Sequence, residues 1–211
     1  VVVVMDKVAW HNESGELLRA QLQVPVPSLP QAEPSMRITY IEPAQFNGLF
    51  KTMRNVLWVS LDSARYTQVN FSVEEDRWAK GQCLLMLHAP NEQQLAAYLL
   101  QHNETLVERF SLLERKRWIQ ALNENFSLSV KDSLLSRFGC SLHVPKEIRV
   151  GKVSDQFLWA SNQANRGRMD LIAYTFPYTT PEAFSETYLV VKRDSVLRQQ
   201  IPGSFPGSYM Q

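Results

Sequence analysis

Three short, continuous apolar runs constrain the fold of this chain more than any other feature. Residues 1–5, 56–61 and 83–89 carry hydrophobic side chains at nearly every position. A strand that is covered on both faces has this pattern, whereas a strand with one solvated face alternates apolar and polar residues. The sequence therefore predicts buried strands with other structure packed on both sides.

Helical patterns lie between and after these runs. One helix must end before Pro25, and another begins at Pro43, since proline suits a first helical turn but not a helix interior. Asn91 and Gln94 predict the capped start of a long helix that reaches about Asn125. The expected inward side chains of the helix after Pro43 are Phe46, Leu49, Phe50 and Met53, and those of the long helix are Leu95, Leu99, Leu106, Phe110 and Leu113.

Weaker strand signals complete the first half of the chain. The second half contains shorter predicted strands with turns between them. Residues 36–41 predict a strand near a sheet edge, and residues 66–73 a further strand. Residues 129–138 predict a helix that ends at Gly139. Short strands of a meander are predicted at 141–144, 147–153, 156–161 and 169–176. A last helix opens at Pro181, with inward residues Phe184, Tyr188, Val191 and Leu197.

These patterns predict an α+β protein with two subdomains. Residues 1–127 alternate strands and helices, whereas residues 128–211 form a small antiparallel sheet flanked by helices. The long helix bridges the two parts.

Charge, hydropathy and cysteine content exclude several classes of protein. The chain has 22 basic and 21 acidic residues, so no overall field attracts nucleic acid, and we predict no nucleic-acid partner. No apolar run approaches the roughly 18–20 residues of a membrane-spanning helix. Cys83 and Cys140 lie in apolar runs and form no CxxC motif. They are expected to be free, although a single bridge between them stays open.

No catalytic or metal-binding motif is present. The histidines, which are His11, His88, His102 and His143, stand in no metal-ligand spacing and beside no recognisable nucleophile elbow. The glycines form no phosphate-binding loop. Structural or surface roles are therefore favoured for the histidines, and we predict no metal and no cofactor.

Two basic, tryptophan-containing segments are the best candidates for a binding site. Arg166 and Arg168 flank a glycine on a predicted loop, with Trp159 on the neighbouring strand. Two guanidinium groups in this arrangement can hold a carboxylate or phosphate, although a plain hairpin loop has the same sequence. Arg77, Trp78 and Lys80 form a second candidate, for which a packing role is the alternative.

Several short segments together resemble a known family. They are residues 2–6, 24–31, 46–47, 77–82, 138–139, 144–146, 157–162, 166–167, 174–178 and 191–194. In these the chain resembles a bacterial family of cell-envelope lipoproteins, the domain of unknown function 4837 family. The resemblance implies an extracytoplasmic protein held at a membrane by an N-terminal lipid upstream of Val1, and a family chain that continues past Gln211. It implies no substrate, reaction or catalytic residue.

Three functional hypotheses follow. The first is a lipid-anchored binding or interaction module of the cell envelope, whose partner is an anionic small molecule or an envelope protein. The second is an envelope hydrolase with an unrecognised site, which requires a histidine or carboxylate beside a nucleophile. The third is a structural component of an envelope assembly that docks through an apolar patch.

Overall fold

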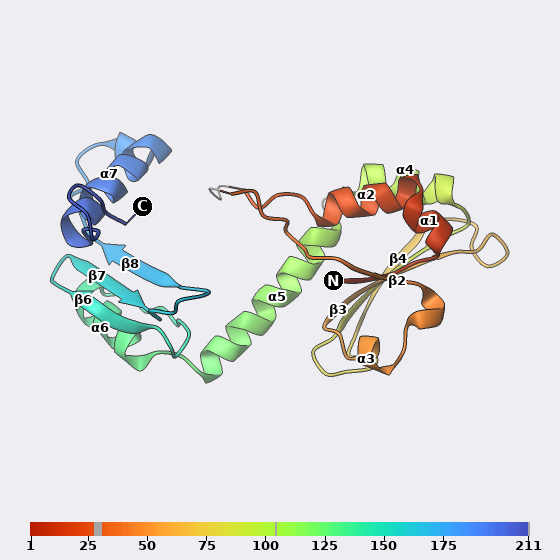
Figure 1. Ribbon diagram of the computed structural model, residues 1–211, viewed down its shortest axis with the longest axis horizontal. Helices are drawn as coiled ribbons and strands as arrows, with labels where there is room; N and C mark the ends of the chain where they lie inside the picture. The colour runs from red at the N-terminus through yellow and green to blue at the C-terminus, as the bar shows by residue number, and fades with distance from the viewer. Residues whose placement is uncertain (28–30, 104, 211) are drawn as a thin grey trace. The chain divides into compact units, whose positions relative to one another are not determined.

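A computed structural model describes residues 1–27, 31–103 and 105–210 of the chain. These residues fold into two compact units, Val1–Ile119 and the chain from Gln120 onward. The first unit holds a five-stranded mixed sheet and the second a three-stranded antiparallel sheet, both accompanied by helices (Figure 1). The predicted α+β class is therefore confirmed.

The first sheet is built around the three apolar runs. Its strands are β1 (Val2–Val4), β2 (Thr39–Ile41), β3 (Asn55–Leu61), β4 (Asn70–Glu75) and β5 (Cys83–Ala89), in the order β2-β1-β3-β5-β4. Strands β2, β1, β3 and β5 are parallel, and β4 pairs antiparallel with β5. The apolar runs occupy the three central strands, and β2 lies at an edge, as the sequence predicts.

Helices cover one face of this sheet. They are α1 (Lys7–His11), α2 (Glu13–Leu22), α4 (Glu92–Gln101) and α5 (Thr105–Glu124). Figure 1 shows α1, α2 and α4 on the same side of the strands. Their apolar side chains form the main core of the unit with alternate residues of the central strands, and Phe110 of α5 is fully buried there.

The predicted long helix is wrong as a single element, because it is two helices. Asn91 caps α4 as expected, its side chain accepting a hydrogen bond from the Gln94 N–H at 3.0 Å. The helix ends at His102, whose φ of −126° and ψ of 44° leave the helical region. Residue 104 lies outside the described residues. The expected inward positions on both sides of the break are nevertheless buried, namely Leu95, Leu99, Leu106 and Phe110.

The opposite face of the sheet carries a thinner cover. A 3₁₀ turn (Pro43–Gln45) and the one-turn helix α3 (Gly48–Lys51) replace the single helix predicted after Pro43, which is wrong. Asn47 and Gly48 are poor helix formers, so the chain leaves the helical conformation at Phe46. Phe46 and Phe50 still pack on the sheet, whereas Leu49 is 66% exposed.

The second unit is a meander with one helix on its main core. Strands β6 (Arg149–Val153), β7 (Phe157–Ser161) and β8 (Asp170–Tyr174) pair antiparallel in chain order, and α6 (Leu128–Phe138) packs against them. Gly139, with a φ of 66°, ends α6 as predicted. The predicted strand at 141–144 is wrong. One isolated bridge, Phe126 to Pro145, stands there instead, since proline has no N–H to continue a ladder.

The last helix also differs from the prediction. A 3₁₀ turn (Pro181–Phe184) precedes α7 (Glu186–Gln200), which Ser185 caps by accepting a hydrogen bond from the Tyr188 N–H. This restart changes the helical register, so Phe184 and Val191 are 76% and 63% exposed rather than inward. Leu197 is buried, as predicted.

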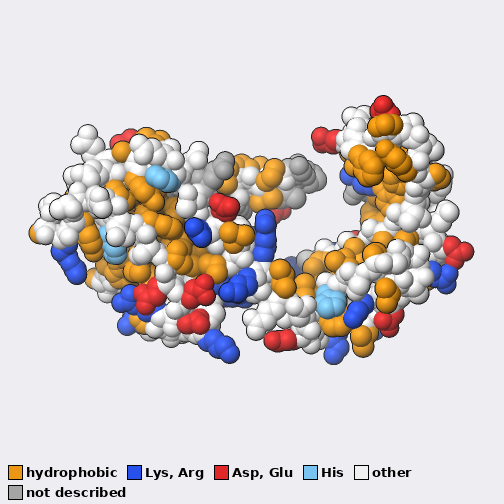
Figure 2. Space-filling model, turned by 180° about the vertical axis from the view of Figure 1, so that it is seen from behind, with side chains coloured by type: hydrophobic (Ala, Val, Ile, Leu, Met, Phe, Trp, Pro, Cys, Tyr) orange, Lys and Arg blue, Asp and Glu red, His pale blue; other side chains and the backbone are white. Residues whose placement is uncertain are grey.

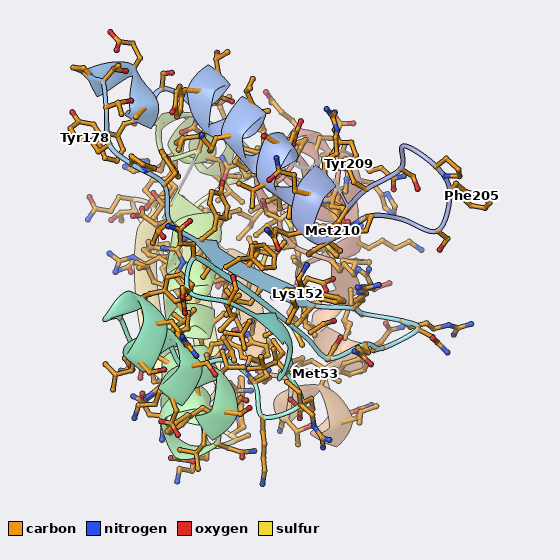
Figure 3. All side chains as sticks on the ribbon, turned by 90° about the vertical axis from the view of Figure 1, so that its left-hand side faces the viewer. Met53, Lys152, Tyr178, Phe205, Tyr209 and Met210 are labelled. Carbon is orange, nitrogen blue, oxygen red and sulfur yellow. The ribbon has the colours of Figure 1, made fainter. Side chains whose placement is uncertain are left out.

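Apolar side chains consequently reach the surface around α7. Figure 2 shows hydrophobic groups gathered there. Phe205 lies at the tip of the loop after α7, and Tyr178 lies near the other end of the helix (Figure 3). No helix in the described part of the chain is long and apolar enough to cross a membrane.

Candidate ligand site on the first sheet

A cavity of about 310 Å³ lies on the face of the first sheet that the large helices leave uncovered. Alternate residues of a strand project to the same face. In the parallel β3–β5 pair, Trp58 stands beside Met86 and Ser60 beside His88. These side chains, together with Leu84, form the floor. Arg65 and Tyr66 on one side, and Arg77 and Trp78 on the other, complete the lining.

The floor contains a serine–histidine contact. The Ser60 Oγ and the His88 Nδ1 are 3.1 Å apart. Burial lowers the pKa of His88, and the positive charge of Arg65 lowers it further. The imidazole is therefore neutral at pH 7, because its pKa falls below the ordinary value of about 6.5.

The first wall is fixed by a turn after β3. The Asp62 side chain accepts hydrogen bonds from the Ala64 and Arg65 N–H groups at 2.9 and 3.2 Å. This turn displaces the predicted strand at 66–73, which begins instead at Asn70. It brings the Tyr66 ring over the imidazole of His88, with centroids 4.8 Å apart and planes 12° from parallel.

The second wall is fixed by a buried glutamine. Gln82 is 2% exposed, and its Nε2 donates to the carbonyls of Lys51 and Met53 at 2.7 and 2.8 Å. Its Oε1 accepts a hydrogen bond from the Trp78 N–H at 3.2 Å. Gln82 thereby ties the loop between β4 and β5 to the α3 segment, and the Trp78 ring packs 5.2 Å from that of Phe46.

The cavity carries positive charge beside flat aromatic faces. Arg77 pairs with Glu74 at 2.9 Å and lies over the Trp78 ring at 5.0 Å. The Arg65 guanidinium lies 6.0 Å from the centroid of the Tyr66 ring. Among the described residues no ion pair joins Arg65 to a carboxylate. A free guanidinium beside aromatic rings suits a planar ligand that carries a carboxylate or phosphate.

Within residues 1–27, 31–103 and 105–210, no three His, Cys, Asp or Glu side chains cluster as metal ligands. The chemistry that the lining itself offers is anion binding, ring stacking and proton exchange at the serine–histidine pair.

Comparison with protein families divides the chain into two segments. A model described as a domain of unknown function, DUF8532, matches residues 1–123, more than half of the chain. The chain therefore belongs to the DUF8532 family. A second model, the domain of unknown function DUF4837, matches residues 127–211 and confirms the resemblance over that segment. The resembling segments before residue 124 fall within DUF8532 instead. No curated protein and no solved structure matches the chain.

The DUF8532 segment carries the whole cavity and part of the predicted site. Arg77 and Trp78 line the cavity. Lys80 is exposed on the same loop and does not line the cavity. A role in binding stays a prediction for all three residues.

The DUF4837 segment contains the other predicted site residues. The Trp159 Nε1 donates to Asp170 at 2.8 Å, and Arg168 pairs with the same carboxylate at 2.9 Å. Although burial alone raises it, these hydrogen bonds lower the pKa of Asp170 overall. Gly167 has a φ of 65°, as the hairpin alternative requires, and Arg166 is exposed. Trp159 and Arg168 thus already share an anionic partner, and ligand binding by this loop stays a prediction.

Several lining residues had no recognisable signal of their own. Trp58 and Ser60, like Met86 and His88, stand two positions apart in strands that the sequence marks only as apolar. Their two-residue spacing places each pair on one face, but only the pairing of β3 with β5 brings the pairs together. The sequence predicts a strand at Tyr66 and a structural or surface role for His88.

Proposed function

We propose that the DUF8532 segment binds a small planar anion in the cavity on the first sheet. The observation that carries this proposal is Arg65, a guanidinium without a carboxylate partner among the described residues, at the rim of an aromatic cavity. A cavity of about 310 Å³ lies at the lower end of the range for small-molecule sites. The expected ligand is therefore a compact aromatic or heteroaromatic carboxylate or phosphate.

The lining supports both parts of such a ligand. The rings of Trp58, Tyr66 and Trp78 offer flat apolar surfaces for a planar group. A guanidinium binds a carboxylate through parallel N–H···O bonds, and such charge-assisted bonds are the stronger ones. Because His88 is neutral at pH 7, the positive charge that the lining offers to an anionic group comes from Arg65 and Arg77.

The proposal is tested with benzoate as the probe and its uncharged analogue benzamide as the comparison. Benzoate is titrated into ¹⁵N-labelled protein, and the indole N–H signals are followed by NMR. We expect the signals of Trp58 and Trp78 to shift, while those of Trp10, Trp118 and Trp159 stay in place. Replacing Arg65 by Gln should weaken benzoate binding about tenfold or more, the loss expected for a hydrogen bond to a charged group.

The same loop offers a matched control. Lys80→Gln removes a nearby positive charge outside the lining and should leave benzoate binding unchanged. Replacing both Arg166 and Arg168 by Ala tests the site predicted in the other segment. Equal binding of benzoate and benzamide would contradict the proposal. Loss of binding in the Arg166/Arg168 variant, with Arg65→Gln unaffected, would move the site to that loop.

We also propose that the protein works in the bacterial cell envelope, anchored by an N-terminal lipid. The support is the resemblance of residues 127–211 to the DUF4837 family. The natural precursor, expressed with an alkyne fatty acid in the medium, should incorporate the label and enter the membrane fraction. A precursor that stays unlabelled and is recovered in the cytoplasmic fraction would refute this placement.

A further inference from the structure

We propose that the cavity is also a hydrolytic site, in which Ser60 is the nucleophile and His88 its general base. The substrate class is an ester whose anionic group the arginines hold. The inference rests on the proposed function, since it uses the same cavity and the same anion. It goes beyond binding because it assigns a bond-breaking role to two floor residues.

The distance between the two groups suits proton transfer. The Ser60 Oγ and the His88 Nδ1 are 3.1 Å apart, within the reach required of a nucleophile and its base. Ser60 on β3 and His88 on β5 are paired residues of two adjacent strands. A pair mounted on paired strands keeps its geometry better than a pair on two loops. In the proposed role the imidazole carries its own proton on Nε2, so that Nδ1 accepts the serine proton.

Among the residues that the structure describes, a ring stack and not a carboxylate orients the base. A nucleophile's base usually has a third group that fixes its ring. Here the Tyr66 ring lies 4.8 Å from the imidazole of His88 and is nearly parallel to it. The turn at Asp62 fixes the backbone that carries this ring, because the Asp62 carbonyl accepts a hydrogen bond from the Tyr66 N–H at 2.9 Å. The imidazole is thus confined between its own strand and an aromatic face.

The charges around the pair act on both the base and the oxyanion. Burial and, after it, the positive charge of Arg65 lower the pKa of His88 and favour the neutral imidazole that can accept a proton, although the same charge opposes the imidazolium formed when the proton is transferred. The other charged residue of the lining is Arg77, which is balanced by Glu74. Positive charge at the rim also stabilises the oxyanion that forms when an ester carbonyl is attacked.

The step balances with water as the second reactant. The Ser60 Oγ forms a bond to the ester carbonyl carbon while its proton passes to the His88 Nδ1. The bond from that carbon to the leaving oxygen then breaks, and the imidazolium returns the proton to the departing alcohol. Water next attacks the acyl-serine, gives its proton to His88, and releases the carboxylic acid. Ser60 regains its proton from His88, so both residues end unchanged.

The test is covalent labelling with a fluorophosphonate, read by peptide mass spectrometry. The Ser60 Oγ–P bond forms as the P–F bond breaks, with the serine proton taken up by His88 and fluoride released. We expect one adduct per chain, on the peptide that contains Ser60. Replacing His88 by Gln should slow labelling about a hundredfold or more, the usual contribution of a general base.

A neighbouring serine supplies the control. Ser72 lies on β4 opposite Met86 and is outside the cavity lining. Ser72→Ala should label like the unchanged protein, whereas Ser60→Ala should not label. Absence of an adduct on Ser60, or equal labelling in His88→Gln, overturns the hydrolytic role. Circular dichroism of each variant shows that the fold is kept.

The two proposals fail separately. If benzoate shifts the Trp58 and Trp78 signals but Ser60 is not labelled, the cavity binds anions and the hydrolytic role is rejected. If neither occurs, both proposals are rejected. Labelling at Ser60 without benzoate binding keeps the nucleophile and rejects the anion as the recognised group.

Discussion

At the residue scale, similar sequence surroundings give the two cysteines opposite environments. Both lie in apolar runs, yet Cys83 is fully buried in β5 and Cys140 is exposed just after α6. Both are free thiols, so the possible bridge between them is not formed. Burial raises the pKa of Cys83 to about 11, although Arg117 acts in the opposite direction.

We expect one thiol of the native protein to react quickly with a disulfide reagent at about pH 8. At that pH only about one in a thousand Cys83 side chains is a thiolate, and the reagent cannot reach it. Replacing Cys140 by Ser should abolish the fast reaction, and both thiols of the unchanged protein should react after unfolding in denaturant. Two fast thiols in the native state would contradict the burial of Cys83.

His88 gives the stability of the first unit a dependence on pH. Its pKa is lower in the folded protein than in the unfolded chain, so the unfolded chain takes up a proton first as the pH falls. The contribution of His88 to the free energy of unfolding is therefore fully present above about pH 6.5. It decreases as the pH drops from there through the pKa of His88 in the folded protein. Melting temperatures from about pH 7.5 to about pH 5 should fall less steeply for His88→Gln than for the unchanged protein. Parallel curves for the two proteins would count against this reading.

At the element scale, the walls of the cavity are formed by the connections between strands and not by the strands themselves. The strands β3 and β5 bring Ser60 and His88 together, but the walls come from a turn at Asp62 and a loop held by Gln82. Each connection is tied by a polar side chain that bonds to backbone groups. Such residues look unremarkable in a sequence because their partners are distant or irregular.

Replacing Gln82 by Ala tests the role of this loop anchor. The change leaves the carbonyls of Lys51 and Met53 without their donor, at a cost of about 1–3 kcal/mol in the free energy of unfolding. The Trp78 indole signal should also broaden, because its loop loses the bond to the Trp78 N–H. The control is Gln120→Ala, which alters an exposed contact with Glu124 and should change stability by less than about 0.5 kcal/mol. A stable Gln82→Ala protein with a sharp Trp78 signal would refute the anchoring role.

At the scale of the whole molecule, each unit has hydrophobic clusters made of its own residues. The clusters on the two faces of the first sheet extend no further along the chain than α5, and the cluster of the second unit begins at α6. The family match divides the chain at nearly the same place, with one domain at 1–123 and the other at 127–211.

We expect core truncations to act on the unit that contains them. Phe110→Ala should destabilise the first unit by about 3–5 kcal/mol, and Leu158→Ala the second by about 2–5 kcal/mol. In differential scanning calorimetry each variant should lower one transition and leave the other near its original temperature. A single transition that shifts equally in both variants would show that the units unfold together.

The sequence by itself determined the elements whose signal is local. Continuous apolar runs identified β1, β3 and β5, Asn91 and Gly139 marked helix ends, and the meander followed from short strands between turns. These features depend on neighbouring residues, whose propensities can be read in order. The helix breaks at His102 and Ser185 depend on small differences in helix propensity. The helical patterns in the sequence continue across both positions and do not predict the breaks.

Only the tertiary structure decided the candidate site. Ser60 and His88 are 28 residues apart, and their contact depends on which strands pair and in what register. Arg77 and Trp78 were visible from their residue types, but Arg65 and Tyr66 gained significance only when a turn placed them over the sheet. The order of the strands depends on all apolar faces of the unit being buried together. It is therefore a property of the whole unit and cannot be predicted from one segment.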